Sequence, residues 1–291
     1  MLRLIGGAVT AVGLVLATAA TAVAQDKPTL YFSAIPDDDE TRLMQRFASV
    51  AEYLSKELGV PVQYVPVKNY AASVVAFRND QIQLAWFGGL SGVQARLAVP
   101  GSQALAQGDE DMKFISYFIA HESTGLEEGE VFPKAAEGMT FTFGAQTSTS
   151  GRLFPDYYIR EETGKAPDEF FSQVGFSGDH GQTLKVVSTG AYQIGALNYT
   201  VYDTAVKENA PEVATTRVIW KTPPYPDYNW TIRGDADARF GEGFSDKVKA
   251  ALIGMTDPEL LASFPRKAFV AASNDDYGPI LDVGQKLDLL D

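Results

Sequence analysis

The sequence predicts an α/β protein of two lobes, with a central cleft between them and two segments that cross from one lobe to the other. Three observations support this. Strand-like and helix-like segments alternate from residue 29 to residue 89, and the alternation resumes from residue 113 to residue 199. The 267 residues that follow position 24 also exceed the usual size of one domain.

The first 24 residues have the pattern of a secretory signal peptide. Arg3 precedes an apolar stretch rich in small residues, and Ala22-Val23-Ala24 forms a cleavage-type end before Gln25. We therefore expect residues 1–24 to be removed during export, which leaves a soluble mature chain. The alternative is an N-terminal membrane anchor, against which the interrupting Thr and Gly residues argue.

The composition excludes several classes of function. The chain has no Cys and only two His, so it has no disulfide scaffold, no thiol nucleophile and few ligands for a metal centre. Without Arg3, 23 basic and 37 acidic side chains leave a net charge of about −14, which disfavours nucleic acid as a partner. We expect no metal and no cofactor, and any bound anion must be held by local donors.

The first part of the chain is predicted to form a parallel sheet. Acidic residues at the start, apolar residues at helical spacing and a closing glycine indicate a helix over residues 36–59. Asn69 is a candidate cap for a second helix. The expected order is strand 29–35, helix 36–59, strand 60–67, helix 69–80 and strand 82–89.

The second part of the chain repeats this pattern. The expected elements are strands at 113–121, 139–145 and 193–199, a helix at 182–190, and a strand, proline-rich turn and strand over 216–232. The tail is predicted to form two helical pieces separated by Pro258. We place the crossings near 118–124 and 220–228. Lobe 1 then comprises residues 25–119 and 224–291, and lobe 2 comprises residues 120–223.

The stretch FGAQTSTSGRLFP, residues 143–155, is the strongest candidate for binding. Its Thr-Ser-Thr-Ser run, residues 147–150, follows a predicted strand and precedes a predicted helix. Ligands of parallel α/β sheets bind at the carboxyl ends of strands, where helix N-termini present free N–H groups and partial positive charge. The run therefore predicts a cradle for a tetrahedral oxyanion. The alternative is a polar turn whose serine only caps the helix.

Three further places carry residues that suit the same cleft. Tyr70 opens the second predicted helix, Trp86 and Phe87 end the third strand before two glycines, and His180 lies at a loop-to-helix junction. Each has a structural alternative, namely a half-buried core phenol, core aromatic packing, and a capping or solvated imidazole.

Several long stretches carry a resemblance to a known family. They include VPVKNYAASVVAFRNDQIQLAWFGGLSGVQAR, GAQTSTSGRLFP, FSGDHGQTL, GALNYTVYD and IWKTPPYPDYNW. In this order they resemble the periplasmic solute-binding proteins of phosphate, phosphite and phosphonate ABC importers, across essentially the whole mature chain. The most similar subgroup is one often labelled selenate-binding. The resemblance implies a type II periplasmic binding protein, whose two α/β lobes close on a ligand, and a location in the periplasm.

The resemblance also implies a set of ligand-binding residues. They are Tyr70, Trp86, Phe87, Ser148, Thr149, Ser150, His180, Asn198, Asp227 and Tyr228. The serines and the threonine correspond to the residues that hold the oxyanion through hydroxyls and amides. The tyrosine that the family often has near the end of the third strand is absent here, so Trp86 or Phe87 can supply only a wall.

Asp227 bears on which oxyanion is bound. A carboxylate repels an oxyanion unless the ligand carries a proton to donate, as phosphite, phosphonates and selenite do near neutral pH and selenate and sulfate do not. Asn198 stands where aminoalkylphosphonate binders of the family carry an acid that pairs the ligand ammonium group. We therefore expect a small, simple oxyanion, either of phosphite, phosphonate or phosphate type, or selenate or selenite.

The function implied by the resemblance is capture of this oxyanion and its delivery, by a monomer, to an ABC permease in the inner membrane. The alternative is a periplasmic sensor that presents its ligand state to a membrane histidine kinase. An enzyme is not expected, because the sequence has no nucleophile elbow, no HExxH and no P-loop motif. The acidic runs 37–40 and 127–130 are expected to be solvated rather than to bind a metal.

Overall fold

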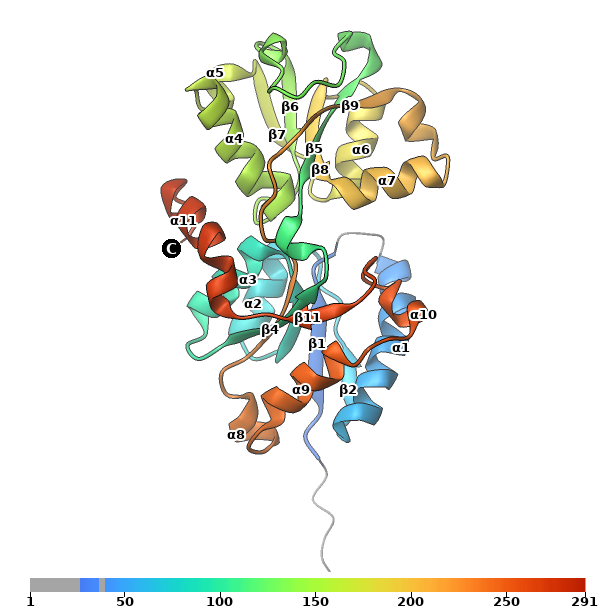
Figure 1. Cartoon of the computed structure of the whole chain (residues 1–291), viewed down its shortest axis with the longest axis vertical. Coiled ribbons are helices and arrows are strands. Elements are labelled where there is room, and N and C mark those ends of the chain that lie inside the picture. Colours follow the sequence, from blue (N-terminus) through green and yellow to red (C-terminus); the bar gives the residue numbers. More distant parts are fainter. Residues whose placement is uncertain (1–26, 37–39, 291) are drawn as a thin grey trace, which may run out of the picture.

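The computed structural model describes residues 27–36 and 40–290. The predicted signal peptide and most of the acidic run at 37–40 lie outside the described residues. Within the described ranges, no helix is long and apolar enough to cross a membrane. The chain forms two lobes that lie end to end along the long axis of the molecule (Figure 1).

Lobe 1 is built on a mixed sheet of six strands. They are β1 (Leu30–Ala34), β2 (Val62–Tyr64), β3 (Leu84–Phe87), β4 (Gln103–Gly108), β10 (Asn229–Ile232) and β11 (Phe269–Ala271). The order across the sheet is β11-β4-β10-β3-β1-β2. The three strands β1, β2 and β3 are parallel, as the sequence predicts, but β10 runs antiparallel between β3 and β4. The parallel arrangement predicted for residues 29–89 is therefore confirmed, and the sheet as a whole is mixed because the chain returning from lobe 2 enters it from the opposite end.

Lobe 2 is built on a mixed sheet of five strands. They are β5 (Ser116–His121), β6 (Thr140–Phe143), β7 (Gln173–Phe176), β8 (Ile194–Asn198) and β9 (Thr216–Lys221). Their order is β7-β6-β8-β5-β9. The strands β6, β7 and β8 are parallel, whereas β5 runs antiparallel to both β8 and β9.

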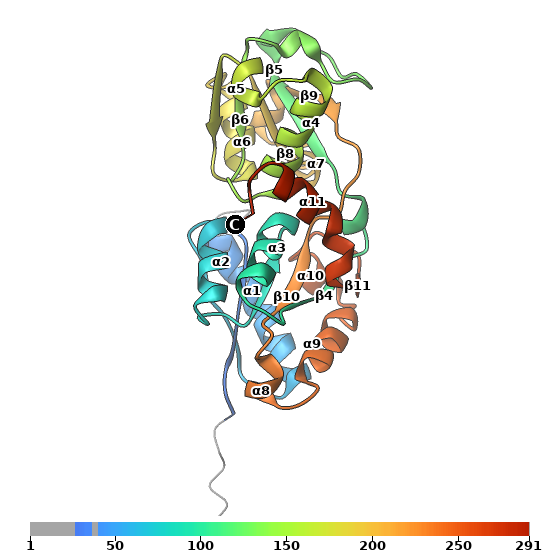
Figure 2. The ribbon, with the colours of Figure 1, turned by 90° about the vertical axis from the view of Figure 1, so that its left-hand side faces the viewer.

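Helices cover both sheets (Figures 1 and 2). Those of lobe 1 are α1 (Glu40–Leu58), α2 (Tyr70–Arg78), α3 (Gly89–Ala98), α8 (Ala236–Phe240), α9 (Phe244–Ile253), α10 (Pro258–Leu261) and α11 (Gly278–Lys286). Those of lobe 2 are α4 (Phe154–Thr163), α5 (Pro167–Phe170), α6 (His180–Ser188) and α7 (Tyr199–Lys207). Short helical turns are η1 (Asp111–Lys113), η2 (Glu122–Thr124), η3 (Lys134–Ala136), η4 (Thr149–Leu153), η5 (Pro211–Ala214) and η6 (Asn274–Tyr277).

Local sequence explains where α1 and α2 begin and end. The apolar residues that recur at helical spacing in α1, including Leu43, Phe47 and Leu54, are all buried against lobe 1. Gly59 ends this helix with φ +68°, a left-handed conformation that glycine adopts at little cost. Asn69 caps α2, as predicted, by accepting a hydrogen bond from the N–H of Ala72 at 2.8 Å.

Two segments cross between the lobes. Strand β5 lies wholly in the sheet of lobe 2, so the first crossing runs over residues 109–115, earlier than the 118–124 that the sequence suggested. The second runs over residues 222–228. Phe114 and Tyr225 exchange two main-chain hydrogen bonds of 2.9 Å, which join the crossings side by side. The sequence predicts one strand over residues 113–121. In the structure Phe114 instead forms this separate bridge, and β5 begins at Ser116.

Candidate ligand-binding site between the lobes

The Ser/Thr run forms a tight turn at the carboxyl end of β6. Ser148, Thr149 and Ser150 are each no more than 2% exposed, and the chain enters α4 through the single π-helical turn η4. The Ser148 hydroxyl accepts a hydrogen bond from the Gly151 N–H at 3.0 Å. A Cβ at Gly151 would lie 3.2 Å from both Gly144 Cα and His180 Cε1, so the close approach favours glycine. The capping interpretation therefore holds for Ser148, whose main-chain N–H also donates to the carbonyl of Ala145 at 3.1 Å.

Thr149 bridges the two lobes. Its hydroxyl accepts a hydrogen bond from the N–H of Leu90, in the first turn of α3, at 2.9 Å. The same hydroxyl is hydrogen-bonded to the Asp227 carboxyl. A side chain of lobe 2 is therefore bonded to a helix N-terminus of lobe 1 and to the second crossing.

Asp227 is a buried carboxyl at the end of the second crossing. It is 1% exposed, and its Oδ1 accepts a hydrogen bond from the N–H of Gly89 at 2.9 Å. Its Oδ2 is buried and has no hydrogen-bond partner among the described residues. Burial raises the pKa of Asp227 to about 7, against the hydrogen bonds from Gly89 and Thr149 that favour the carboxylate. The carboxyl can therefore carry or give up a proton near neutral pH.

His180 faces the same space from lobe 2. It is the first residue of α6 and is 1% exposed. Its Nδ1 accepts the main-chain N–H of Asn198 at 3.2 Å, so the proton of the neutral ring is assigned to Nε2. Burial lowers the pKa of His180 to about 4, which keeps the ring neutral, and Nε2 has no hydrogen-bond partner among the described residues. The ring of Tyr70 meets that of His180 edge-on, with centroids 6.3 Å apart.

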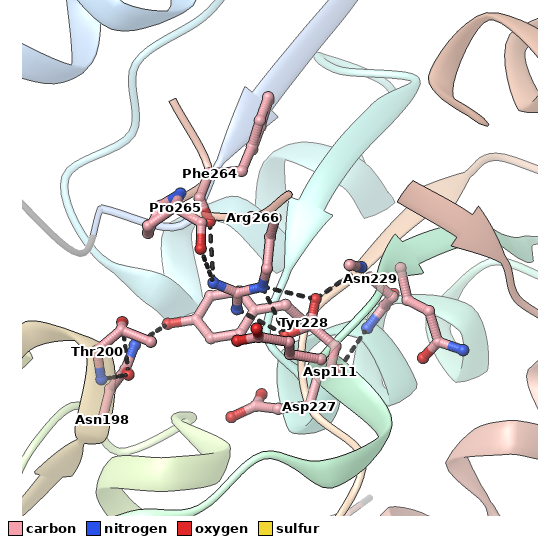
Figure 3. Close-up of polar contacts among 12 residues, drawn as sticks. Asp111, Asn198, Thr200, Asp227, Tyr228, Asn229, Phe264, Pro265 and Arg266 are labelled. Carbon is pink, nitrogen blue, oxygen red and sulfur yellow. Dashed lines mark hydrogen bonds and ion pairs between the residues drawn. The ribbon is translucent and has the colours of Figure 1, made fainter. Parts of the chain in front are cut away.

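Asn198 and Tyr228 join the lobes beside this group. Asn198 Nδ2 donates to the Tyr228 hydroxyl at 3.1 Å, and Asn198 Oδ1 accepts from the N–H and the hydroxyl of Thr200 at 2.7 and 2.8 Å (Figure 3). The oxygen of Asn198 is therefore occupied in capping α7. The Asn198 side chain therefore hydrogen-bonds other protein groups through both its nitrogen and its oxygen.

Trp86 and Phe87 lie in the core of lobe 1. Trp86 stacks on Tyr228 with centroids 5.4 Å apart and an angle of 21°, and it also packs against Trp230 and Phe264. Phe87 packs edge-on against Phe77 on α2. Trp86 thus packs against the ring of Tyr228. Trp86 and Phe87 are both buried core aromatics, which was the structural alternative for these two residues.

Several groups that shape this region could not be recognised from the sequence. Gly89 and Leu90 supply main-chain donors at the start of α3, and Ser116 donates to the carbonyl of Ser150 at 2.7 Å. The two glycines after β3 were the only local signal for the first pair. Arg152, the cation nearest to the Ser/Thr run in sequence, pairs with Asp156 at 2.8 Å. Arg152 is therefore already paired, and the polar groups that lie together between the lobes are neutral donors and the carboxyl of Asp227.

Two α/β lobes, two joined crossings and a buried polar site between the lobes define a two-lobed ligand-binding protein. Comparisons with known proteins specify the family. Residues 32–277 match the family model described as ABC transporter, phosphonate, periplasmic substrate-binding protein. The chain belongs to this family of binding proteins and is not an enzyme.

Individual relatives agree with this assignment. The phosphite-binding protein PhnD1 of an ABC transporter from Prochlorococcus marinus is 38% identical over 265 residues, 89% of each chain. The solved structure of PhnD1 with methylphosphonate has a TM-score of 0.84 and covers 89% of this chain and 98% of its own, at 37% identity. The phosphonates-binding periplasmic protein of Escherichia coli is 27% identical over 207 residues, 69% of this chain and 60% of its own.

Proposed function

We propose that the protein captures a small phosphorus oxyanion that carries a proton, such as phosphite or methylphosphonate, and delivers it to an inner-membrane ABC permease. The observation that supports the proposal is that several neutral hydrogen-bond donors lie together with one buried carboxyl, that of Asp227. Residues 148–150 supply main-chain and hydroxyl donors, His180 supplies Nε2–H, and Asp227 presents Oδ2. Charge-assisted hydrogen bonds of about 1.5 to 3 kcal/mol each, less the cost of ordering, are enough for roughly micromolar binding.

The proton shared with Asp227 is the basis of selectivity. An ionised carboxylate accepts a hydrogen bond from a ligand hydroxyl and repels an anion that has no proton. A protonated carboxyl can instead donate to a fully deprotonated oxygen. Because the pKa of Asp227 is raised to about 7, selenate and sulfate are rejected most strongly above that pH and are better tolerated below it.

The surroundings of Asn198 favour a ligand without an amino group. Its amide bonds Tyr228 and Thr200, and it brings no negative charge to pair an ammonium group. The relative PhnD1 is named as a phosphite-binding protein, and its solved structure is a complex with methylphosphonate. We therefore place small, simple phosphorus oxyanions ahead of 2-aminoethylphosphonate.

The partner and the site of action are also proposed. Family membership supports a periplasmic monomer whose residues 1–24 are removed on export, and an ABC permease as its partner. The sensor alternative differs only in that partner. Permease and ATPase genes beside the gene for this protein would support uptake, and a histidine-kinase gene would support sensing.

A thermal-shift panel on the mature protein at pH 7 tests the proposed ligand class. Phosphite, methylphosphonate, phosphate, 2-aminoethylphosphonate, selenite, selenate and sulfate are compared, and Ser150→Ala is included as a site variant. A ligand at 100 times its Kd adds about 2.7 kcal/mol to the free energy of unfolding. We expect stabilisation by phosphite or methylphosphonate, and at least tenfold weaker binding by Ser150→Ala. Stabilisation by selenate alone contradicts the proposal.

A further inference from the structure

A buried ion pair lies beside the crossings, outside the set of ligand contacts proposed above. The side chains of Asp111 and Arg266 are 0% and 3% exposed. Arg266 Nη2 lies 2.6 Å from Asp111 Oδ1, and Arg266 Nε lies 3.0 Å from both carboxylate oxygens (Figure 3). The Gly108 N–H donates to Asp111 Oδ2 at 2.7 Å, and Arg266 Nη1 donates to the carbonyls of Phe264 and Pro265. The pair is thus anchored on both sides within lobe 1.

The main chain of Asp111 connects this pair to the ligand site. The carbonyl of Asp111 accepts a hydrogen bond from the N–H of Asp227 at 2.9 Å. The bridge between Phe114 and Tyr225 lies just beyond this bond on both crossings. The main chain of Asp111 therefore holds the main chain of Asp227, and Arg266 in turn holds the side chain of Asp111.

Arg266 also supports the aromatic neighbour of Asp227. Its guanidinium carbon lies 5.1 Å from the ring centroid of Tyr228 and 5.5 Å from that of Phe114. The carbonyl of Tyr228 accepts a hydrogen bond from the hydroxyl of Tyr277 at 3.2 Å. One guanidinium thus contacts both crossings, and the second crossing is fixed at Tyr228 as well as at Asp227.

The packing around the pair leaves little freedom. A Cβ at Gly108 would lie 2.5 Å from Arg266 Cδ and 2.5 Å from Asp111 Oδ2, so the main chain of β4 rests directly on the pair. Desolvation makes a buried ion pair a poor source of net stability, but its geometry can fix one arrangement among several. Here the fixed arrangement is the turn that carries Asp227.

We propose that Asp111 and Arg266 are positioning residues of the ligand site, which hold residues 225–228 so that the Asp227 carboxyl meets the ligand. The inference rests on the proposed function, because it assigns a purpose to the same site. The pair holds the turn in the ligand-free protein too, since each of its bonds is made within lobe 1 and the crossings.

The two charges act on Asp227 in opposite directions. Asp111 favours the protonated form of Asp227 and Arg266 favours the carboxylate, while the phenols of Tyr225 and Tyr277 are further titratable groups near it. Asp111→Asn leaves the Arg266 charge unbalanced, which lowers the pKa of Asp227. The pH below which sulfate binds should then fall. Arg266→Lys keeps the charge but loses the forked geometry, so this pH should not move.

The experiment compares Asp111→Asn, Arg266→Lys and the double variant Asp111→Asn/Arg266→Gln with the wild type. Calorimetry gives the Kd of methylphosphonate and of phosphite at pH 7, and the pH midpoint of sulfate binding, at a temperature where each protein is folded. Asp80→Asn is the matched control. Asp80 also accepts two hydrogen bonds from an arginine, Arg239, but it lines a surface depression with Pro28 and Tyr31 and has no bond to either crossing.

We expect both single variants to bind methylphosphonate at least tenfold more weakly, while Asp80→Asn stays within twofold of the wild type. Only Asp111→Asn should lower the sulfate midpoint, and the neutral double variant should restore it. Binding within twofold of the wild type by the folded single variants overturns the inference.

A measurement on the wild type needs no variant. The Asp227 amide of the ligand-free protein should exchange with solvent at least a hundredfold more slowly than an unprotected amide, and unprotected exchange also overturns the inference. If the wild type binds neither methylphosphonate nor phosphite, the proposed function fails first, and this result is distinct from a normal wild type with unaffected variants.

Discussion

The two sides of the ligand site differ in their chemistry. Lobe 2 presents neutral donors, namely the turn at residues 148–150 and the neutral imidazole of His180. The side formed by lobe 1 and the second crossing presents a buried carboxyl, Asp227, held by the N–H of Gly89. Thr149 bonds the two sides to each other.

This difference suggests separate roles for the two sides, one in holding an oxyanion and the other in distinguishing between oxyanions. Neutral donors at the end of a strand stabilise any tetrahedral oxyanion, because N–H and O–H groups do not distinguish its protonation state. A carboxyl distinguishes it, because the carboxylate needs a proton from the ligand and the acid does not. Lobe 2 should therefore determine how tightly an oxyanion is held, and Asp227 should determine which one.

Replacement of the carboxyl should have the largest effect. Asp227→Asn removes the acceptor for the ligand proton, so we expect phosphite or methylphosphonate to bind about a hundredfold more weakly at pH 8. Sulfate and selenate should bind better than to the wild type at that pH, and their pH dependence should disappear. Calorimetry from pH 5.5 to pH 8.5 measures both effects, and an unchanged ranking of anions contradicts the role of Asp227.

The same variant should change the stability of the ligand-free protein. Burial raises the pKa of Asp227 to about 7 from 3.8 in the unfolded chain, so the folded state loses stability as pH rises through this range, and the loss is complete above pH 7. Linkage gives about 1.4 kcal/mol for each pH unit between the two pKa values. We expect Asp227→Asn to raise Tm at pH 8.5 relative to the wild type, and to change it little near pH 4.

Removal of the imidazole should have an intermediate effect. His180→Ala deletes the Nε2–H donor and leaves the N–H of Asn198 without its acceptor, so we expect binding of all oxyanions to weaken at least tenfold without a change in their ranking. His121→Ala is the matched control, because Nδ1 of the His121 ring bonds the nearby Ser123 at the end of β5. A change of ranking in His180→Ala would mean that discrimination is not confined to Asp227.

Loss of the link between the two sides should have the smallest effect. Thr149→Val removes the hydroxyl that bonds Leu90 N–H and Asp227 but keeps the main-chain N–H for the ligand. We expect a severalfold faster dissociation rate in stopped-flow measurements and a nearly unchanged association rate, because the bond joins the two lobes. Thr163→Val is the control, because the Thr163 hydroxyl bonds nearby main-chain groups, those of Ile159 and Lys165, at the C-terminal end of α4. A slower association rate with unchanged dissociation contradicts this role.

Local sequence was sufficient for most of the elements and for part of the site. The spacing of apolar residues predicted α1, Asn69 was recognised as the cap of α2, and the Ser/Thr run was placed between a strand and a helix. These features depend on residues a few positions apart, whose periodicity and capping chemistry are visible in the sequence. The family was likewise recognised from motifs in sequence order.

Only the tertiary structure decided how distant segments meet. The insertion of β10 between β3 and β4, the bond between Thr149 and Leu90, and the pair Asp111–Arg266, 155 positions apart, depend on the path of the whole chain. The raised pKa of Asp227 has the same origin, because burial by segments far away in sequence sets it. The sequence alone thus determined which groups could bind an oxyanion. Desolvation and long-range contacts decided which of them face each other and which proton they share.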